Sequence, residues 1–174
     1  MSRVRCPKPF HKKATSRTPD GKMPGESKSS PREIQNYLGR ISGPLLDRID
    51  LHIEVPAVKF REMSSAQPGE TSAQIRARVI AARQRQQARF RDKPKITCNA
   101  QMGSRELKQF CELDDATKDL LKFAMTDLNL SARAYDRVLK VARTIADLAA
   151  SEKITSDHIS EAIQFRSLDR QLWG

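Results

Sequence analysis

Two arginines in this chain are candidates for contact with a phosphate group. Arg48 is flanked by Asp47 and Asp50, between a short apolar segment and an alternating stretch. Arg133 follows Ser131 by two residues, at the predicted start of a helix. Phosphoryl transfer builds negative charge on the transferred group, and a fixed guanidinium stabilises that charge. Helix N-termini also favour phosphate, because their unpaired N–H groups and the helix dipole point at it.

Each of these arginines also has a structural interpretation. Arg48 can pair with the neighbouring carboxylates, and Arg133 can be an ordinary solvated arginine on a helix surface. Charged side chains are rarely buried without a partner, so both interpretations are physically sound. Residue types and spacing alone leave the two interpretations open.

A third set of cationic residues suggests contact with nucleic acid. Arg78, Arg85 and Arg89 are spaced by seven and four residues, which places them on one side of a helix. Such a ridge suits non-specific contact with a DNA backbone, because no base-reading or stacking aromatic residues accompany it. A charged face turned to solvent is the alternative interpretation.

Other chemistry is not indicated by the sequence. There is no G-x-x-x-x-G-K-(S/T) phosphate loop, and no apolar strand ends in paired acids for magnesium. Cys6 and His11 do not form a recognisable zinc spacing, so no metal site is predicted. The chain has three cysteines, Cys6, Cys98 and Cys111. So few cysteines, and an odd number, predict reduced thiols in a cytoplasmic protein. Cys111 lies in an apolar helical pattern and is predicted to pack in the core.

The chain has 174 residues and a net charge of +11, more than half of it in residues 1–30. Those residues are rich in Pro, Gly, Ser, Lys and Arg, and they predict a disordered basic tail. A basic surplus favours polyanionic partners. No apolar run is long enough to span a membrane, and the N-terminus lacks the apolar core of a secretory signal.

Residues 31–60 predict one helix followed by one strand. Ser30 and Glu33 form a capping-box pattern around Pro31, a residue that suits the first helical position. The strand follows from Leu51, with apolar and polar residues alternating. A single strand cannot form a stable sheet, so this segment resembles a piece of a larger α/β domain.

Residues 71–172 predict a helical bundle. Thr71, Asp114, Ser131 and Thr155 stand at predicted helix starts, and Asn129 stands at a predicted C-cap. The predicted helices cover 71–91, 104–111, 114–128, 131–151 and a segment from 155, with a loop over 92–103. The fold class is therefore mainly α.

Two motifs carry a resemblance to a known family. Residues 42–51 read S-G-P-L-L-D-R-I-D-L, and residues 130–134 read L-S-A-R-A. Both patterns resemble the ComM/YifB-like, magnesium chelatase-like branch of the AAA+ ATPases. The resemblance implies that 31–60 is the end of the AAA+ α/β core and that 71–172 is the helical lid.

The same resemblance implies roles and partners. Arg48 matches the arginine finger, which acts in trans, and Arg133 matches the sensor-2 arginine, which contacts nucleotide phosphate. It also implies ATP and magnesium in the full-length protein, a missing N-terminal part of the core, and a homo-oligomeric ring. The implied function is a motor acting on DNA, as a helicase or in branch migration during recombination or transformation. This chain alone is expected to be inactive, because it lacks the phosphate loop and the magnesium-binding strand.

Two other functions remain open at this point. A stand-alone basic helical module that binds DNA or a partner protein would explain the charge. A subunit of a true magnesium chelatase, acting with other subunits on a tetrapyrrole, is the other alternative.

Overall fold

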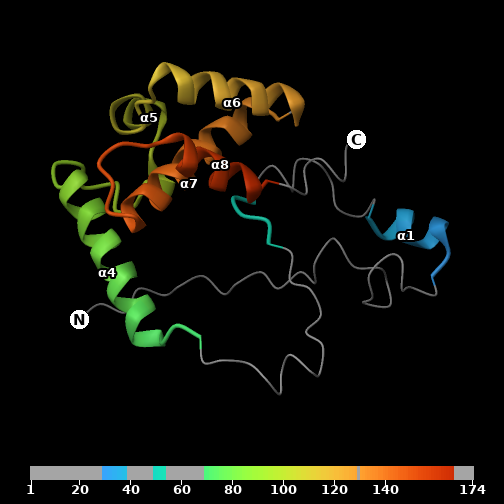
Figure 1. The fold of residues 1–174 in the computed structure, drawn as a ribbon, viewed down its shortest axis with the longest axis horizontal. Coiled ribbons are helices and arrows are strands. Elements are labelled where there is room, and N and C mark those ends of the chain that lie inside the picture. Colours follow the sequence, from blue (N-terminus) through green and yellow to red (C-terminus); the bar gives the residue numbers. More distant parts are fainter. Residues whose placement is uncertain (1–28, 39–48, 54–68, 129, 167–174) are drawn as a thin grey trace. The chain divides into compact units, whose positions relative to one another are not determined.

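In the computed structural model, the chain divides into two compact units, residues 1–46 and 47–174. The structure describes residues 29–38, 49–53, 69–128 and 130–166, which are coloured in Figure 1. The predicted basic tail up to residue 28, Arg48 and the predicted C-cap Asn129 lie outside the described residues.

The described part of the first unit is helix α1 (Pro31–Leu38). The N–H of Ser30 donates to Glu33 Oε2 at 2.8 Å, and the N–H of Glu33 donates to Ser30 Oγ at 3.4 Å. This reciprocal pair is the predicted capping box, which satisfies two N–H groups that a helix start leaves unpaired. The start of this helix was therefore correctly predicted.

The second unit is a helical bundle, and its predicted helices are confirmed to within a few residues at each end. Local caps explain the agreement: Thr71 and Gln74 form a capping box, and Ser131 Oγ accepts from the N–H of Ala134 at 3.2 Å. The elements are α4 (Ser72–Arg89), the 3₁₀ helix η1 (Asn99–Gln101), α5 (Ser104–Phe110), α6 (Asp115–Asp127), α7 (Ala132–Leu148) and α8 (Ser156–Gln164).

Helix α7 is the centre of the bundle. It packs against α4, η1, α5 and α8, and α6 packs against α8. In Figure 1, α7 and α8 lie between α4 on one side and α5 with α6 on the other. The apolar stripe of α7 supplies much of the core, since Val138, Leu139, Ala142 and Ala146 belong to the same buried cluster as Leu121 of α6. Cys111 also lies in this core, as predicted.

Helix α4 has two different halves. Its second half packs on α7, where Ala82 and Phe90 are each 3% exposed. Its first half carries only exposed residues from Thr71 to Ile80, and Ile75 and Val79 are nearly half exposed. The apolar residues of α4 are therefore covered over only part of the helix.

The segment 49–53 differs from the prediction. Residues 51–53 are not part of a strand, and the rest of the predicted strand lies outside the described residues. The N–H of His52 donates to the carbonyl of Phe165 at 2.8 Å, at the end of α8. The predicted alternation is present, because His52 is buried while Leu51 and Ile53 are exposed. A strand needs a neighbouring strand to accept its ladder, and within the described ranges no such neighbour exists.

The end of α7 turns sharply back over the helix. Ala150 has φ 58°, and the N–H of Ser151 donates to the carbonyl of Ala146 at 2.8 Å. This left-handed turn resembles a Schellman cap, in which the chain folds back and satisfies a free helix carbonyl. It directs the next two carbonyls towards the side chain of Arg143.

Candidate functional site

Arg133 lies at the second position of α7, where the helix begins. The N-cap residue Ser131 uses its hydroxyl to hold the N–H of Ala134, which fixes the first turn. Arg133 is exposed, and the structure gives it no hydrogen bond or ion pair with any described residue. An exposed cation beside a positive helix end is suited to bind an anion such as phosphate.

Arg137 lies one turn after Arg133 on the same helix, and it forms an ion pair with Asp50. Arg166, which follows α8 and is 1% exposed, donates to the carbonyl of Ile49. These contacts tie the segment that directly follows Arg48 in the sequence to α7 and to the end of α8. No sequence pattern indicated them, because the paired residues are far apart along the chain.

Of the three arginines predicted to form a ridge on α4, Arg78 and Arg85 are exposed and Arg89 is partly buried. Arg78 forms a bidentate ion pair with Glu70, with Nη1–Oε1 and Nη2–Oε2 distances of 2.7 and 2.9 Å, and both side chains are well exposed. Arg85 donates to the carbonyl of Asp147 at 3.1 Å, and Arg89 pairs with the carboxylate of Asp147. The contacts of Arg85 and Arg89 favour a structural role, and contact between the ridge and DNA stays a prediction.

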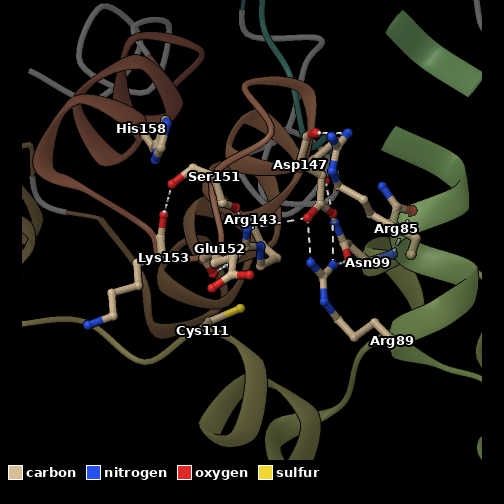
Figure 2. A network of polar contacts seen from close by, with 12 residues as sticks. Arg85, Arg89, Asn99, Cys111, Arg143, Asp147, Ser151, Glu152, Lys153 and His158 are labelled. Atoms are coloured by element: carbon tan, nitrogen blue, oxygen red, sulfur yellow. Dashed lines mark hydrogen bonds and ion pairs between the residues drawn. The ribbon is translucent and has the colours of Figure 1, made fainter. Parts of the chain in front are cut away.

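Asp147 is the centre of a buried polar network that sequence reasoning missed (Figure 2). Its side chain is 0% exposed and receives hydrogen bonds from Arg89 Nη1 and Asn99 Nδ2, each at 2.8 Å. Arg143 Nη2 lies 3.3 Å from Asp147 Oδ1 and also donates to the carbonyl of Ser151 at 2.6 Å. Asn99 belongs to η1, so the network joins α4, η1 and α7.

Two opposing effects set the pKa of Asp147. Burial would raise it, but hydrogen bonds from Arg89 and Asn99 and the charges of Arg89 and Arg143 outweigh burial. The resulting pKa lies below the ordinary aspartate value, so Asp147 is ionised at neutral pH. Burial also lowers the pKa of Arg143, although the nearby Asp147 opposes this effect. The only signal in the sequence was the spacing of four residues between Arg143 and Asp147 beside an apolar stripe.

The structure offers little for other chemistry. Burial raises the pKa of the Cys111 thiol to about 11, so this group stays protonated and is a poor nucleophile. A groove of about 530 Å³ beside the α7–α8 turn is lined by side chains of both charges, including Asp114, Glu152 and Lys153. In the described ranges, no three His, Cys, Asp or Glu side chains gather as metal ligands would. None of the described helices combines the length and apolar character needed to cross a bilayer.

Two family descriptions match the chain. Residues 69–166 match "Magnesium chelatase, subunit ChlI C-terminal", and residues 13–63 match "Magnesium chelatase, subunit ChlI". The first match covers the whole described bundle from the start of α4 to the end of α8. The second covers α1 and the segment that contains Arg48.

Several curated proteins are similar over most of the chain. The uncharacterized protein YifB of Escherichia coli and the competence protein ComM of Haemophilus influenzae are each 42% identical over 161 residues. Those residues are 91% of this chain and 31% of each relative. An uncharacterized protein of Mycobacterium bovis, Mb2921c, is 36% identical over 132 residues, which are 76% of this chain and 26% of the relative. The chain therefore spans about a third of the length of the curated relatives it matches.

The family match and the relatives agree with the two sequence motifs and with the mainly helical fold. The chain belongs to the magnesium chelatase ChlI family of AAA+ proteins, among its ComM/YifB-like members.

Proposed function

We propose that this chain is the C-terminal part of an ATP-hydrolysing AAA+ motor, to which it supplies two arginines. Arg133 contacts the nucleotide phosphates from the helical lid, and Arg48 acts as the arginine finger on a neighbouring subunit of a homo-oligomeric ring. The observation that carries the proposal is the position of Arg133, exposed in the first turn of α7 and without a described partner.

The first turn of α7 is suited to the phosphates of ATP. The free N–H groups and the helix dipole place positive potential there, and the guanidinium of Arg133 adds a full charge with several donors. Helix α7 is held rigidly, because its next turns are buried in the core. A cation fixed to a rigid element loses little freedom when it binds, which favours a defined contact with the phosphates.

Arg48 lies outside the described residues, so the support for its role comes from the motif at residues 42–51 and from the family match over 13–63. An arginine finger stabilises the charge that develops on the γ-phosphate during transfer. The phosphate loop and the magnesium ligands must then come from the part of the relatives that this chain does not match. On its own, the chain is expected to show no ATP turnover.

The effect of Arg133 on nucleotide affinity tests the proposal. The protein to use is a chimera in which this chain replaces the matching third of the Haemophilus influenzae relative. Arg133→Gln removes one charge-assisted contact to phosphate, which is worth about 1.5–3 kcal/mol. The dissociation constant for ATP should therefore rise about tenfold or more, as measured with a fluorescent ATP analogue.

The matched control is Arg105→Gln on α5, another exposed arginine of the same bundle. It should leave ATP affinity unchanged. Equal affinities for the parent chimera, Arg133→Gln and Arg105→Gln would contradict the assignment of Arg133 to the nucleotide site.

We further propose DNA as the substrate of the motor, in helicase or branch-migration reactions of recombination or transformation. The support is the basic surplus of the chain, concentrated in residues 1–30, and the name of one relative, a competence protein. Cation-rich segments bind the DNA backbone without reading its sequence.

DNA binding by this chain should be weak, independent of sequence and steeply dependent on salt. Replacing the lysines of the tail (Lys8, Lys12, Lys13, Lys22 and Lys28) by Gln should weaken binding to all sequences equally. The slope of log K against log salt should become shallower by about one for each phosphate that the variant no longer neutralises. A fluorescence-anisotropy titration at several salt concentrations measures both quantities.

Arg78→Ala is the suitable test of the α4 ridge, because Arg78 is exposed, whereas removing Arg89 would break the buried pair with Asp147. An unchanged affinity and slope in Arg78→Ala would leave the tail as the contact with DNA. Unchanged binding in the tail variant as well would contradict the proposed role of the basic surplus.

A further inference from the structure

The first half of α4 is not covered by the other helices of the described bundle. Every residue from Thr71 to Ile80 is exposed, whereas Ala82 and Gln86 in the second half are buried. Figure 1 shows these first turns leading away from α7, the helix on which the second half packs. Because the two halves form one continuous helix, the face that packs on α7 continues into solvent.

The continued face carries an apolar seam with the spacing of a coiled coil. Successive intervals of four, three and four residues, which are those of the d and a positions of a heptad repeat, separate Ile75, Val79, Ala82 and Gln86. The last two are buried, but Ile75 and Val79 are 43% and 46% exposed. We call Ile75 and Val79 the free seam. Its spacing suits a second helix lying along α4.

Arginines occupy both edges of this seam. The e positions of the same heptads hold Arg76 and Arg83, and the g positions hold Arg78 and Arg85. No acidic residue occurs within α4. Charges at e and g lie beside the partner helix and decide which helix can pair. Arginine at all four positions therefore favours glutamate or aspartate on the partner, and it repels a second copy of α4 in either orientation.

One of these edges already binds a carboxylate. Arg78 holds Glu70 through its bidentate ion pair, in which the two N–O distances are 2.7 and 2.9 Å. On the other edge, Arg76 and Arg83 are exposed and have no hydrogen bond or ion pair with any residue that the structure describes. This second edge is open to the carboxylates of another chain.

The free half of α4 is formed before any partner binds. Its first turn is closed by the capping box, in which the N–H of Thr71 donates to Gln74 Oε1 at 2.9 Å. The buried second half holds the axis of the helix against α7. A preformed surface loses little conformational freedom when it binds, which favours a specific contact.

We propose that the free seam and its arginine edges dock an acidic amphipathic helix of a partner protein. Apolar side chains of that helix cover Ile75 and Val79, and its carboxylates pair with Arg76 and Arg83. A DNA backbone would satisfy the arginines but would leave the free seam in water. A helix that lies on a membrane presents a broad apolar face, whereas this seam is bounded by arginines on both sides. The inference is independent of the roles proposed for Arg48 and Arg133.

A designed helical peptide tests the proposal on the chain itself. The peptide carries leucine at its a and d positions and glutamate at e and g, and fluorescence anisotropy should show that it binds the chain. Binding should slow amide hydrogen exchange in residues 72–80 severalfold and leave exchange in α5 unchanged. A peptide with lysine at e and g, and a scrambled peptide of the same composition, should not bind. Failure of the glutamate peptide to bind, or equal binding of the scrambled peptide, would overturn the proposal.

Charge reversal on the open edge provides the first variant. Arg76→Glu with Arg83→Glu should weaken binding of the glutamate peptide about tenfold or more, because two attractive pairs become repulsive. The lysine peptide should bind this variant. The matched control, Arg105→Glu with Lys108→Glu, makes the same change in net charge at exposed positions of α5 and should leave binding unchanged. An equal loss in the two double variants would assign the binding to net charge and contradict the proposed surface.

The free seam is tested by Ile75→Gln with Val79→Gln, which removes the apolar contacts and keeps residues that form helices well. Binding of the glutamate peptide should weaken about tenfold or more. Ala77→Gln, on the opposite face of the same turns, should bind as the parent does. Both variants should keep the parental melting temperature, because these positions are exposed. Parental affinity in the seam variant would show that charge alone attracts the peptide, and the docking of a helix would be wrong.

The identity of the occupant is tested separately. The chimera should bind the glutamate peptide as the chain does; a chimera that does not bind would show that the rest of the same protein covers the seam, and a partner protein would be the wrong occupant. Vesicles containing phosphatidylserine, duplex DNA and a raised concentration of the chain alone should each protect residues 72–80 less than the peptide does. Stronger protection by any of these would identify a membrane, DNA or a second copy as the occupant and overturn the proposal.

Discussion

Replacing Arg48 by Ala in the chimera should lower kcat for ATP hydrolysis about 10³-fold or more, as loss of an arginine finger does in related NTPases. In the proposed role the guanidinium acts on charge that develops only in the transition state, so the loss should fall on kcat. Nucleotide binding should survive the change, because Arg133 and the phosphate loop remain. Steady-state phosphate release measures the rate, and a fluorescent ATP analogue measures the affinity.

Arg105→Ala is the matched control for this experiment, since it removes an exposed arginine from another part of the bundle. It should keep the parental kcat. The role of Arg48 would be contradicted by a kcat that stays within the range of this control, or by a loss of nucleotide affinity that accounts for the whole defect.

Asp147→Asn should lower the free energy of unfolding by about 3–5 kcal/mol, as expected when one partner of a buried ion pair is removed. The carboxylate is fully buried and balances Arg89 and Arg143, which are 15% and 3% exposed. An amide keeps the shape but leaves two guanidinium groups without their counter-charge. Urea or guanidinium unfolding of the chain, followed by far-UV circular dichroism, measures the loss.

The same carboxylate predicts how stability depends on pH. The pKa of Asp147 is lower in the folded chain than its ordinary value of 3.8. A lowered pKa means that the unfolded chain binds more protons in this range, so stability falls as the pH drops from 3.8 through the folded-state pKa. The parent chain should lose the contribution of ionised Asp147 to its unfolding free energy in acid. The Asp147→Asn variant should lack that contribution at every pH.

Asp115→Asn provides the comparison, because Asp115 forms a surface pair with Lys118 and its side chain is 98% exposed. It should leave the unfolding free energy unchanged within error. A loss in Asp147→Asn no larger than in Asp115→Asn would show that the buried network contributes nothing to the fold.

Helix starts were predictable from the sequence, because their signals are local. Thr71 with Gln74 and Ser131 with the first turn of α7 satisfy their N–H groups within four residues. The core face of α7 was predictable for the same reason, since a helical stripe needs no knowledge of its partner. Arg133 was placed correctly at the start of α7 by these local signals.

The partners of charged residues were not predictable. The spacing of Arg85 and Arg89 gives the side of α4 on which they lie, but Asp147, which they contact, is about 60 residues further along. Likewise, no local pattern indicates that Asp50 pairs with Arg137. The strand predicted from Leu51 failed over 51–53 because strand formation depends on a neighbouring strand, which alternation alone does not supply.

The most direct test of the central claim is a mixing experiment between two inactive chimeras. One chimera carries Arg48→Ala. In the other, the phosphate-loop lysine that AAA+ membership implies for the Haemophilus influenzae part is replaced. If Arg48 acts in trans, rings that contain both subunits have some sites with an intact phosphate loop and an intact finger from the neighbour. The mixture should then hydrolyse ATP although neither variant does alone. A mixture that forms mixed rings and stays inactive would contradict the claim.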